Sequence, residues 1–205
     1  MNHPLLLLAL CQGFFLTNNV VFIAINGLVG LQLAPLGWMA TLPVTGYVVG
    51  SALSAGLVAK TQSHFGRKRS FQFGLVIAAL SAALCAYAAV TKNFWLLVAA
   101  TVVAGYYNAN AALYRFAGPE LVAPEYKERA ISLVLAGGIL GAFAGPNLAS
   151  ATRSILDVPF AAAYLSLVVV ALLSLVVLSL IQFPEHRAPL PGASSGRPLS
   201  EIVRQ

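Results

Sequence analysis

The stretch Lys60–Arg69 has the sequence KTQSHFGRKR and is the only dense cluster of charge in the first hundred residues. Long apolar runs flank it on both sides. Each of its cations would cost about 2.5–3.5 kcal/mol at the centre of a bilayer, so the stretch is expected to lie in water. Because Lys and Arg concentrate on the cytoplasmic side of membranes, it predicts a cytoplasmic loop between two membrane spans.

The composition supports a membrane protein. Of 205 residues, 59% are hydrophobic and only 9% are charged, whereas soluble domains carry about 25% charged residues. The net charge of +6 then reports on membrane topology, because the cations sit between apolar runs and form no basic face for phosphates. We therefore predict an integral membrane protein whose surroundings are the lipid bilayer, and no nucleic-acid partner.

The apolar runs predict six membrane-spanning helices, each long enough to cross a bilayer. Apolar residues cover every helix face, so run length and loop chemistry decide the assignment instead of periodicity. The runs are too long and too little alternating for the strands of a membrane barrel. The predicted spans are Pro4–Leu28, Trp38–Ala59, Phe71–Val90, Phe94–Tyr114, Ala130–Ser150 and Phe160–Phe183.

The distribution of the 12 Lys and Arg residues predicts the orientation of these spans. Only Lys92 and Arg153 fall on one side of the predicted membrane. The excess on the other side predicts that both termini are cytoplasmic, and we expect the plasma (inner) membrane of a bacterium. The cations on that side are Lys60, Arg67, Lys68, Arg69, Arg115, Lys127, Arg129, Arg187, Arg197 and Arg204.

The chain is predicted to have two parts. Residues 1–183 form the six-helix transmembrane bundle. Residues 184–205 are rich in Pro, Gly and Ser and read as a cytoplasmic linker. We expect this linker to lead to a second bundle that the sequence does not contain.

Two of the predicted spans share a ladder of small residues at four-residue spacing. The second span carries Gly46, Gly50 and Ser54. The fifth carries Gly137, Gly141 and Gly145. Such ladders allow helix backbones to approach closely. They are consistent either with two ordinary packing faces or with two three-helix repeats of opposite membrane orientation.

The loop motif adds a family resemblance. Gly66-Arg67-Lys68-Arg69 resembles the second half of the pattern G-x-x-x-D-R-x-G-R-[KR] of the major facilitator superfamily of transporters. Ala59, Ser63 and His64 replace the first glycine, the aspartate and the first arginine of that pattern. The resemblance implies a role at the inner gate for Gly66, Arg67, Lys68 and Arg69. In the family, the aspartate of the pattern helps to latch the two halves together at the cytoplasmic face. Ser63 carries no charge, so a latch here would be built differently.

The fifth span extends this resemblance. Residues 141–146 (GAFAGP) are similar to the start of the antiporter signature G-x-x-x-G-P-x-x-G-G. Pro146 removes a helix hydrogen bond, and Gly141 and Gly145 allow close packing at the resulting bend. The resemblance covers the whole chain as the N-terminal half of such a transporter. It implies an all-α fold of six helices in two inverted repeats, with Gly141, Gly145 and Pro146 among the gating residues and a possible role in efflux.

Polar residues in the first and fourth spans are the candidates for contact with a solute. Gln12, Asn19 and Asn26 are seven residues apart and therefore share one face of a helix. An amide that faced lipid would be unsatisfied, so this face either makes interhelical hydrogen bonds or lines a cavity. Asn108 and Arg115 have the same spacing in the fourth span. Arg115 is either an arginine at the membrane interface or a gating residue that attracts anions.

The acidic residues all fall outside the predicted spans. Because proton coupling usually needs a titratable group within the membrane, a coupling residue would have to lie in the missing half. Motifs for an intramembrane enzyme are absent from this sequence, and no enzymatic activity, metal or cofactor is predicted. The leading hypothesis is secondary transport of a small organic solute by alternating access. The alternative is a six-helix interaction or regulatory subunit that transports nothing.

Overall fold

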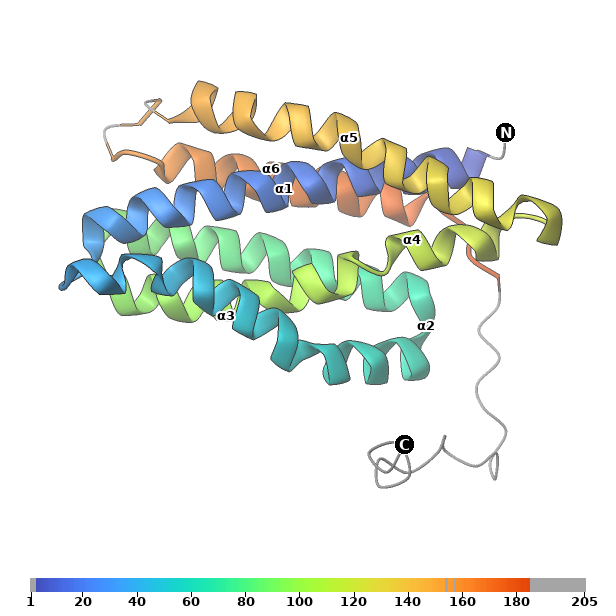
Figure 1. Cartoon of the computed structure of the whole chain (residues 1–205), viewed down its shortest axis with the longest axis horizontal. Coiled ribbons are helices and arrows are strands. Elements are labelled where there is room, and N and C mark those ends of the chain that lie inside the picture. Colours follow the sequence, from blue (N-terminus) through green and yellow to red (C-terminus); the bar gives the residue numbers. More distant parts are fainter. Residues whose placement is uncertain (1–2, 154, 157, 185–205) are drawn as a thin grey trace.

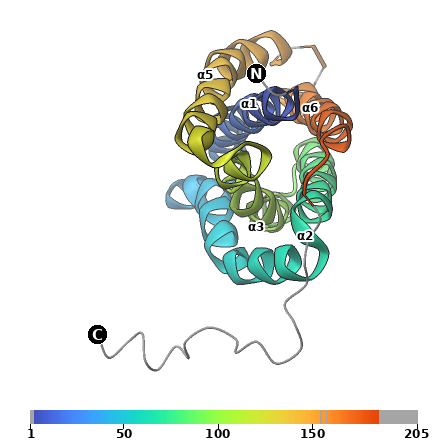
Figure 2. The ribbon, with the colours of Figure 1, turned by 90° about the vertical axis from the view of Figure 1, so that its right-hand side faces the viewer.

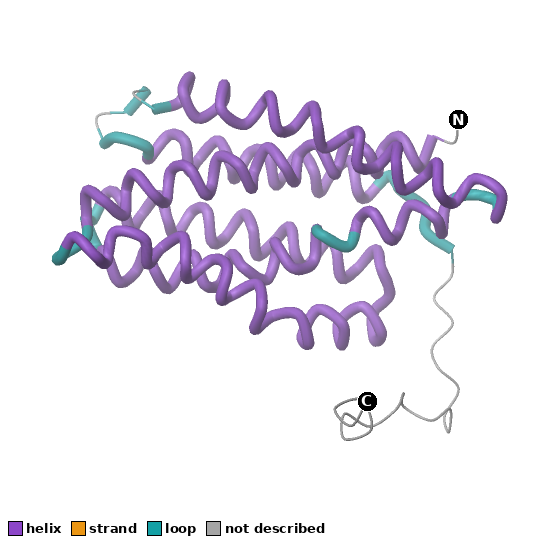
Figure 3. The backbone as a smooth tube through the Cα atoms, in the orientation of Figure 1, coloured by secondary structure: helices purple, strands orange, loops and turns teal. Residues whose placement is uncertain are grey.

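The computed structural model describes residues 3–153, 155–156 and 158–184, and all of its regular structure is helical (Figure 3). The predicted linker from residue 185 onward lies outside the described residues. Three short 3-10 helices, labelled η, join the longer helices. In chain order the elements are α1 (His3–Leu33), η1 (Gly37–Thr41), α2 (Leu42–Val90), α3 (Phe94–Ala111), α4 (Tyr114–Ala117), η2 (Gly118–Leu121), η3 (Pro124–Tyr126), α5 (Lys127–Thr152) and α6 (Ala161–Ser179).

Five helical segments in the described part of the chain are long and apolar enough to cross a membrane. The second and third predicted spans lie in one of them, residues 37–90, because helix continues through the stretch predicted as a loop. Three of the other four segments contain one predicted span each, and the fourth, α6 (Ala161–Ser179), is shorter than the predicted span Phe160–Phe183 at both ends.

The long helix α2 is broken at Gly66, whose φ of 75° and ψ of 172° are not helical. Figure 1 shows α2 running along the bundle and then doubling back at this point. Residues with a side chain adopt such a positive φ only with strain, whereas glycine adopts it readily. We call residues 42–65 the first arm of α2 and residues 67–90 its second arm.

The helices lie side by side along one long axis (Figures 1 and 2). The most extensive helix contacts join α2 to α3, α1 to α5, and α2 to α6. The buried side chains form two clusters, one around Ile25, Leu97 and Tyr164 and the other around Leu8, Phe71 and Tyr114. Large apolar side chains also cover the outside, Leu140 and Phe143 of α5 being 72% and 73% exposed, as expected where lipid or another apolar surface replaces water.

Both small-residue ladders lie in close helix contacts. A side chain at Gly50 would collide with the backbone of Val102 in α3. One at Gly141 would collide with the backbone of Gly13 in α1. Glycine is therefore required at both positions for these backbones to approach.

Candidate functional site

Four polar side chains from three helices form one hydrogen-bonded group, which we call the amide patch: Asn19 of α1, Tyr47 and Ser51 of the first arm of α2, and Asn108 of α3. The amide nitrogen of Asn19 lies 2.7 Å from Oδ1 of Asn108 and 3.3 Å from the hydroxyl of Tyr47. The amide nitrogen of Asn108 lies 3.2 Å from the hydroxyl of Ser51. The structure thus brings together two of the four predicted solute-contacting residues.

The amide patch combines half-buried amides with a pair of buried aromatic rings. Asn19 and Asn108 are half-buried. Tyr47 is buried, and its ring centroid lies 4.8 Å from that of Phe22. Asn19 uses its amide nitrogen for both of its hydrogen bonds, so its Oδ1 has no partner among the described residues. That oxygen is available to accept a hydrogen bond from a polar ligand.

The other two predicted solute-contacting residues have different surroundings. Asn26 is 0% exposed, accepts a hydrogen bond from the Tyr164 hydroxyl at 2.8 Å and donates to the backbone oxygen of Phe22. Gln12 is buried, and its Oε1 has no partner among the described residues. A Cβ added at Gly138 of α5 would lie 3.5 Å from Cγ of Gln12. Asn26 therefore joins α1 to α6, while Gln12 lies toward α5.

A second polar group surrounds the turn of α2. Arg67 forms the one salt bridge found among residues 3–153, 155–156 and 158–184, its Nη2 lying 2.9 Å from Oε1 of Glu120. Arg67 also donates to the side chain of Gln62. Gln62 in turn donates to Oδ1 of Asn110 at 3.1 Å, and the amide nitrogen of Asn110 lies 2.6 Å from the backbone oxygen of Ser70. The predicted gating residue Arg67 thus connects both arms of α2 to α3 and η2.

The remaining cations predicted at the gate differ in their contacts. Lys68 donates to the backbone oxygen of Ser179 at 2.8 Å, at the end of α6, where carbonyl groups lack helical partners. Arg69 is exposed. Arg115 is also exposed, and its guanidinium lies 4.8 Å from the centroid of the neighbouring Phe116 ring.

Two of the three predicted gating residues of α5, Gly141 and Gly145, lie against α1. Gly141 and Gly145 both face Thr17 and its neighbours across a close contact. The hydroxyl of Thr17 lies 3.3 Å from the backbone oxygen of Gly141 and 3.0 Å from that of Gly13. Pro146 lies inside α5 without ending it.

Sequence reasoning missed several partners in these two groups. Tyr47 and Ser51 are four residues apart and therefore share a helix face, which was the available signal for them. Gln62 and Glu120 carried no such signal for their distant partners, because Gln62 meets Asn110 across 48 residues of sequence and Glu120 meets Arg67 across 53. Only the packing of α3 and η2 against α2 brings these pairs together.

These observations define the class of protein. The chain is an integral membrane protein built as an all-helical bundle, with polar groups held between apolar helices and a basic turn at one end. The sequence profile of the Major Facilitator Superfamily matches residues 5–205. The chain belongs to this superfamily.

Known proteins similar to this chain agree with that membership. The Riboflavin transporter RfnT of Brucella anthropi is 34% identical over 203 residues, which cover 98% of this chain and 51% of that protein. The Uncharacterized MFS-type transporter YdeG of Bacillus subtilis is 26% identical over 146 residues, covering 71% of this chain and 34% of that protein. The chain thus spans about half the length of the riboflavin transporter that it matches.

A solved structure shows the same fold. The crystal structure of the human organic anion transporter MFSD10 (TETRAN) superposes with a TM-score of 0.65 at 16% sequence identity. The match covers 88% of this chain and 48% of that one. At this identity the likeness establishes the helical fold, and it assigns no substrate.

Proposed function

We propose that these residues form the N-terminal half of a secondary transporter that carries a small organic solute across the bacterial plasma membrane. The observation that carries this proposal is the amide patch. Its half-buried amides come from α1 and α3 and meet inside an apolar bundle. A polar group in a membrane protein must face protein or a wet cavity, and the half-buried amides fit the wall of such a cavity.

We propose further that each arm of α2 crosses the membrane, which gives six spans in two inverted three-helix repeats. The close helix contacts support this arrangement. The first arm of α2 meets α3 at Gly50 and Gly105, and α5 meets α1 at Gly141 and Gly13. Gly141 lies 91 residues after Gly50 (141 − 50), and Gly105 lies 92 residues after Gly13 (105 − 13). Superposing spans one to three on spans four to six therefore exchanges one contact for the other.

The partner in this mechanism is a second six-helix bundle, supplied by the rest of the natural protein or by another copy. Rocking of the two bundles around a central site would expose that site to each side of the membrane in turn. The contacts of Arg67 and Lys68 hold the turn of α2 against η2 and α6, which supports a role for this turn at the inner gate. Gly141, Gly145 and Pro146 would let α5 adjust against α1.

The first solute to test is riboflavin, which the name of the relative RfnT supplies. The chemistry of the amide patch supports this choice. Asn19 offers an accepting oxygen, and the Phe22 and Tyr47 rings lie beside it. A heteroaromatic solute with N–H groups would donate to that oxygen, while the buried rings hold the Tyr47 hydroxyl beside Asn19.

The test is uptake of radiolabelled riboflavin into proteoliposomes that contain the complete natural protein. We expect uptake above that of empty vesicles, competition by unlabelled riboflavin, and loss of most uptake on Asn19→Ala. The matched control is Gln72→Ala, because Gln72 contacts Ser179 at the turn of α2, away from the amide patch. Uptake by the parent protein no greater than by empty vesicles would reject riboflavin. Equal uptake by both variants would reject the amide patch as the solute site.

Labelling of introduced cysteines tests the proposed orientation. Ser63→Cys near the turn of α2 and Asn93→Cys before α3 fall on opposite sides of a six-span protein with cytoplasmic termini. A membrane-impermeant maleimide added to spheroplasts should label position 93 and spare position 63 until the membrane is opened. The native Cys11 and Cys85 are buried and should add little background. Labelling of both positions in closed spheroplasts would contradict the six-span arrangement.

A further inference from the structure

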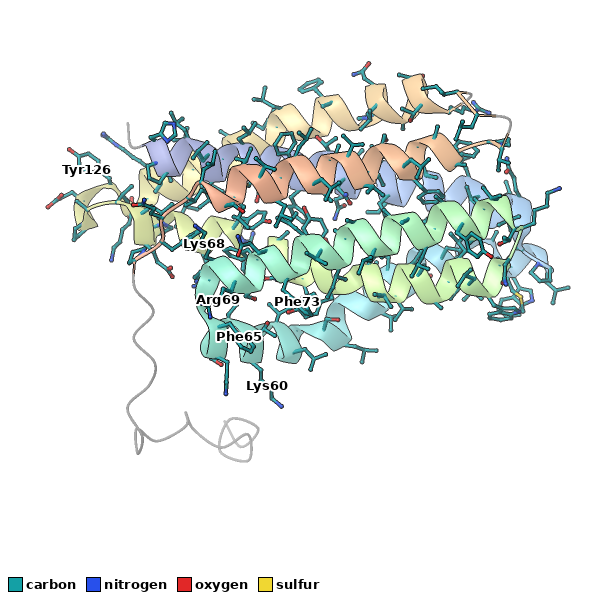
Figure 4. All side chains as sticks on the ribbon, turned by 180° about the vertical axis from the view of Figure 1, so that it is seen from behind. Lys60, Phe65, Lys68, Arg69, Phe73 and Tyr126 are labelled. Carbon is teal, nitrogen blue, oxygen red and sulfur yellow. The ribbon has the colours of Figure 1, made fainter. Side chains whose placement is uncertain are left out.

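The two arms of α2 enclose a cavity next to their turn. It has a volume of about 330 Å³ and is lined by Thr61 and Phe65 of the first arm and by Arg69, Ser70 and Phe73 of the second. Figure 4 shows Phe65, Arg69 and Phe73 gathered at this end of the bundle, with Lys60 beside them. The volume lies at the lower end of the range for small-ligand sites.

Among the residues that the structure describes, two of the four cations around the turn have polar partners and two have none. Arg67 pairs with Glu120, and Lys68 binds the end of α6. Lys60 and Arg69 are exposed, and neither forms an ion pair with a carboxylate of the described residues. Arg69 lines the cavity and Lys60 directly precedes its lining residue Thr61, so this end of α2 carries an uncompensated positive charge.

The wall of the cavity is apolar and reaches the outer surface. Phe65 is 59% exposed and Phe73 is 53% exposed. Phe73 is held in place by an edge-to-face contact with Tyr106 at 5.6 Å between ring centroids. Exposed aromatic rings beside cations are expected where hydrocarbon gives way to headgroups.

The position of the cavity along the membrane axis also fits the boundary between hydrocarbon and headgroups. Lys60 is the first Lys, Arg, Asp or Glu in the chain, so the apolar run of the first arm ends there. The cavity begins at Thr61, directly beyond this boundary. It therefore lies where a phospholipid has its phosphate, with Phe65 and Phe73 available to the start of an acyl chain.

We propose that this cavity binds an anionic phospholipid. The guanidinium of Arg69 and the ammonium of Lys60 hold the phosphate oxygens, and the Phe65 and Phe73 rings contact the acyl chain. A zwitterionic lipid is disfavoured, because its own ammonium group would meet Lys60 and Arg69. The nearby carboxylate of Glu120, which could accept that ammonium, is already bound by Arg67. The site is separate from the amide patch, so it stands independently of the transported solute.

The test places a fluorescent reporter in the cavity of the complete natural protein. Phe65→Trp is introduced, and the protein is reconstituted in phosphatidylcholine vesicles. Two vesicle preparations are compared. Both contain the same minor fraction of a brominated lipid, which is phosphatidylglycerol in one and phosphatidylcholine in the other. Bromine quenches tryptophan on contact, and the fluorescence of the parent protein is subtracted to remove its native tryptophans. We expect the anionic lipid to quench the added signal at least about threefold more strongly, as its enrichment by two cations requires.

Two further measurements complete the experiment: the cations are removed by substitution, and inorganic phosphate is added as a competing free anion. Lys60→Ala combined with Arg69→Ala should abolish the preference for phosphatidylglycerol. The control pair Lys127→Ala and Arg129→Ala, which lies in the first turn of α5, should keep it. Equal quenching by both lipids before any charge is removed would overturn the proposal, as would quenching by neither, which would mean that protein covers the cavity. Loss of the preference on adding inorganic phosphate at constant ionic strength would also overturn it, in favour of a free-anion site.

A readout without the reporter guards against a folding defect in Phe65→Trp. Native mass spectrometry of the parent protein, purified from membranes of mixed lipids, should show a retained anionic phospholipid. The Lys60 and Arg69 double variant should lose that adduct while keeping the elution volume of the parent in size-exclusion chromatography. Retention of the adduct by the double variant would overturn the proposal.

Discussion

Asn19 and Asn26 are the same residue type, seven positions apart on α1, and the structure places them in opposite situations. Asn19 is half-buried and bonds to side chains of α2 and α3, with an oxygen to spare. Asn26 is 0% exposed, and its side chain is engaged by Tyr164 of α6 and by its own helix. The proposed solute contact therefore falls on the amide that is partly exposed, while the other amide holds two helices together.

The difference shows what decides the role of a polar residue inside a membrane bundle. Both amides satisfy the rule that polar groups avoid lipid. Their roles differ because different helices cover α1 at the two levels. At Asn26 the neighbouring tyrosine fills the space, whereas at Asn19 the neighbours are two polar side chains that leave an opening. The comparison can be tested by variants that separate transport from stability.

The largest expected effect is on transport, from Asn19→Leu. This substitution keeps the size of the side chain but removes the accepting oxygen, so we expect solute uptake to fall about tenfold or more, as for the loss of one good hydrogen bond. The melting temperature in detergent should fall less than for Asn26→Leu, because the half-buried Asn108 retains access to water and the buried Tyr47 hydroxyl loses only a contact of 3.3 Å. The measurements are initial uptake rates in proteoliposomes and thermal unfolding. A matching drop in melting temperature would make Asn19 a packing residue like Asn26.

Asn26→Leu should have the converse effect. It leaves the buried hydroxyl of Tyr164 without its acceptor, which we expect to lower the free energy of unfolding by about 1–2 kcal/mol. Uptake per folded molecule should stay within about twofold of the parent. The check is thermal or denaturant unfolding in detergent, alongside uptake normalised to folded protein. A tenfold loss of normalised uptake would place Asn26 in the solute path.

The two phenols provide a third, smaller contrast. Tyr164→Phe in the Asn26→Leu background removes the unpaired hydroxyl, so it should restore most of the lost stability, because replacing both partners of a buried hydrogen bond costs little. Tyr47→Phe should leave stability nearly unchanged and lower uptake about two- to threefold, through poorer positioning of Asn19. A double-mutant cycle over Asn26 and Tyr164 gives the coupling energy. A coupling near zero would mean that the 2.8 Å hydrogen bond contributes nothing to stability.

Much of the fold could be predicted from the sequence, because lipid imposes long apolar helices. Four of the six predicted spans correspond to separate helical segments. The boundary between the second and third could not be placed, because a water-exposed cluster of cations is compatible with either a loop or a helix. Gly66 carries the reversal alone, so the turn is far shorter than the charged stretch suggested. The inverted repeat and the orientation stay predictions.

The candidate site was less predictable. Seven-residue spacing correctly placed Gln12, Asn19 and Asn26 on a face turned toward protein, since two are buried and the third is half-buried. Spacing within one helix gives no information about the partner helix, so the separation of Asn19 from Asn26 could not be foreseen. Tyr47 and Glu120 were missed for the same reason. Each acts through a contact between segments that are distant in the sequence.

The smallest expected effect is that of Ser51→Ala, which tests how far the amide patch extends. Ser51 touches the patch only through Asn108, at 3.2 Å. Ser51→Ala should therefore lower uptake by less than about twofold and leave the melting temperature within error, as interhelical hydrogen bonds in membranes average only about 0.6 kcal/mol. Competition by unlabelled solute should give an unchanged half-saturation concentration. A rise of about fivefold or more in that concentration would place Ser51 in direct contact with the solute and move the centre of the site from Asn19 toward α2.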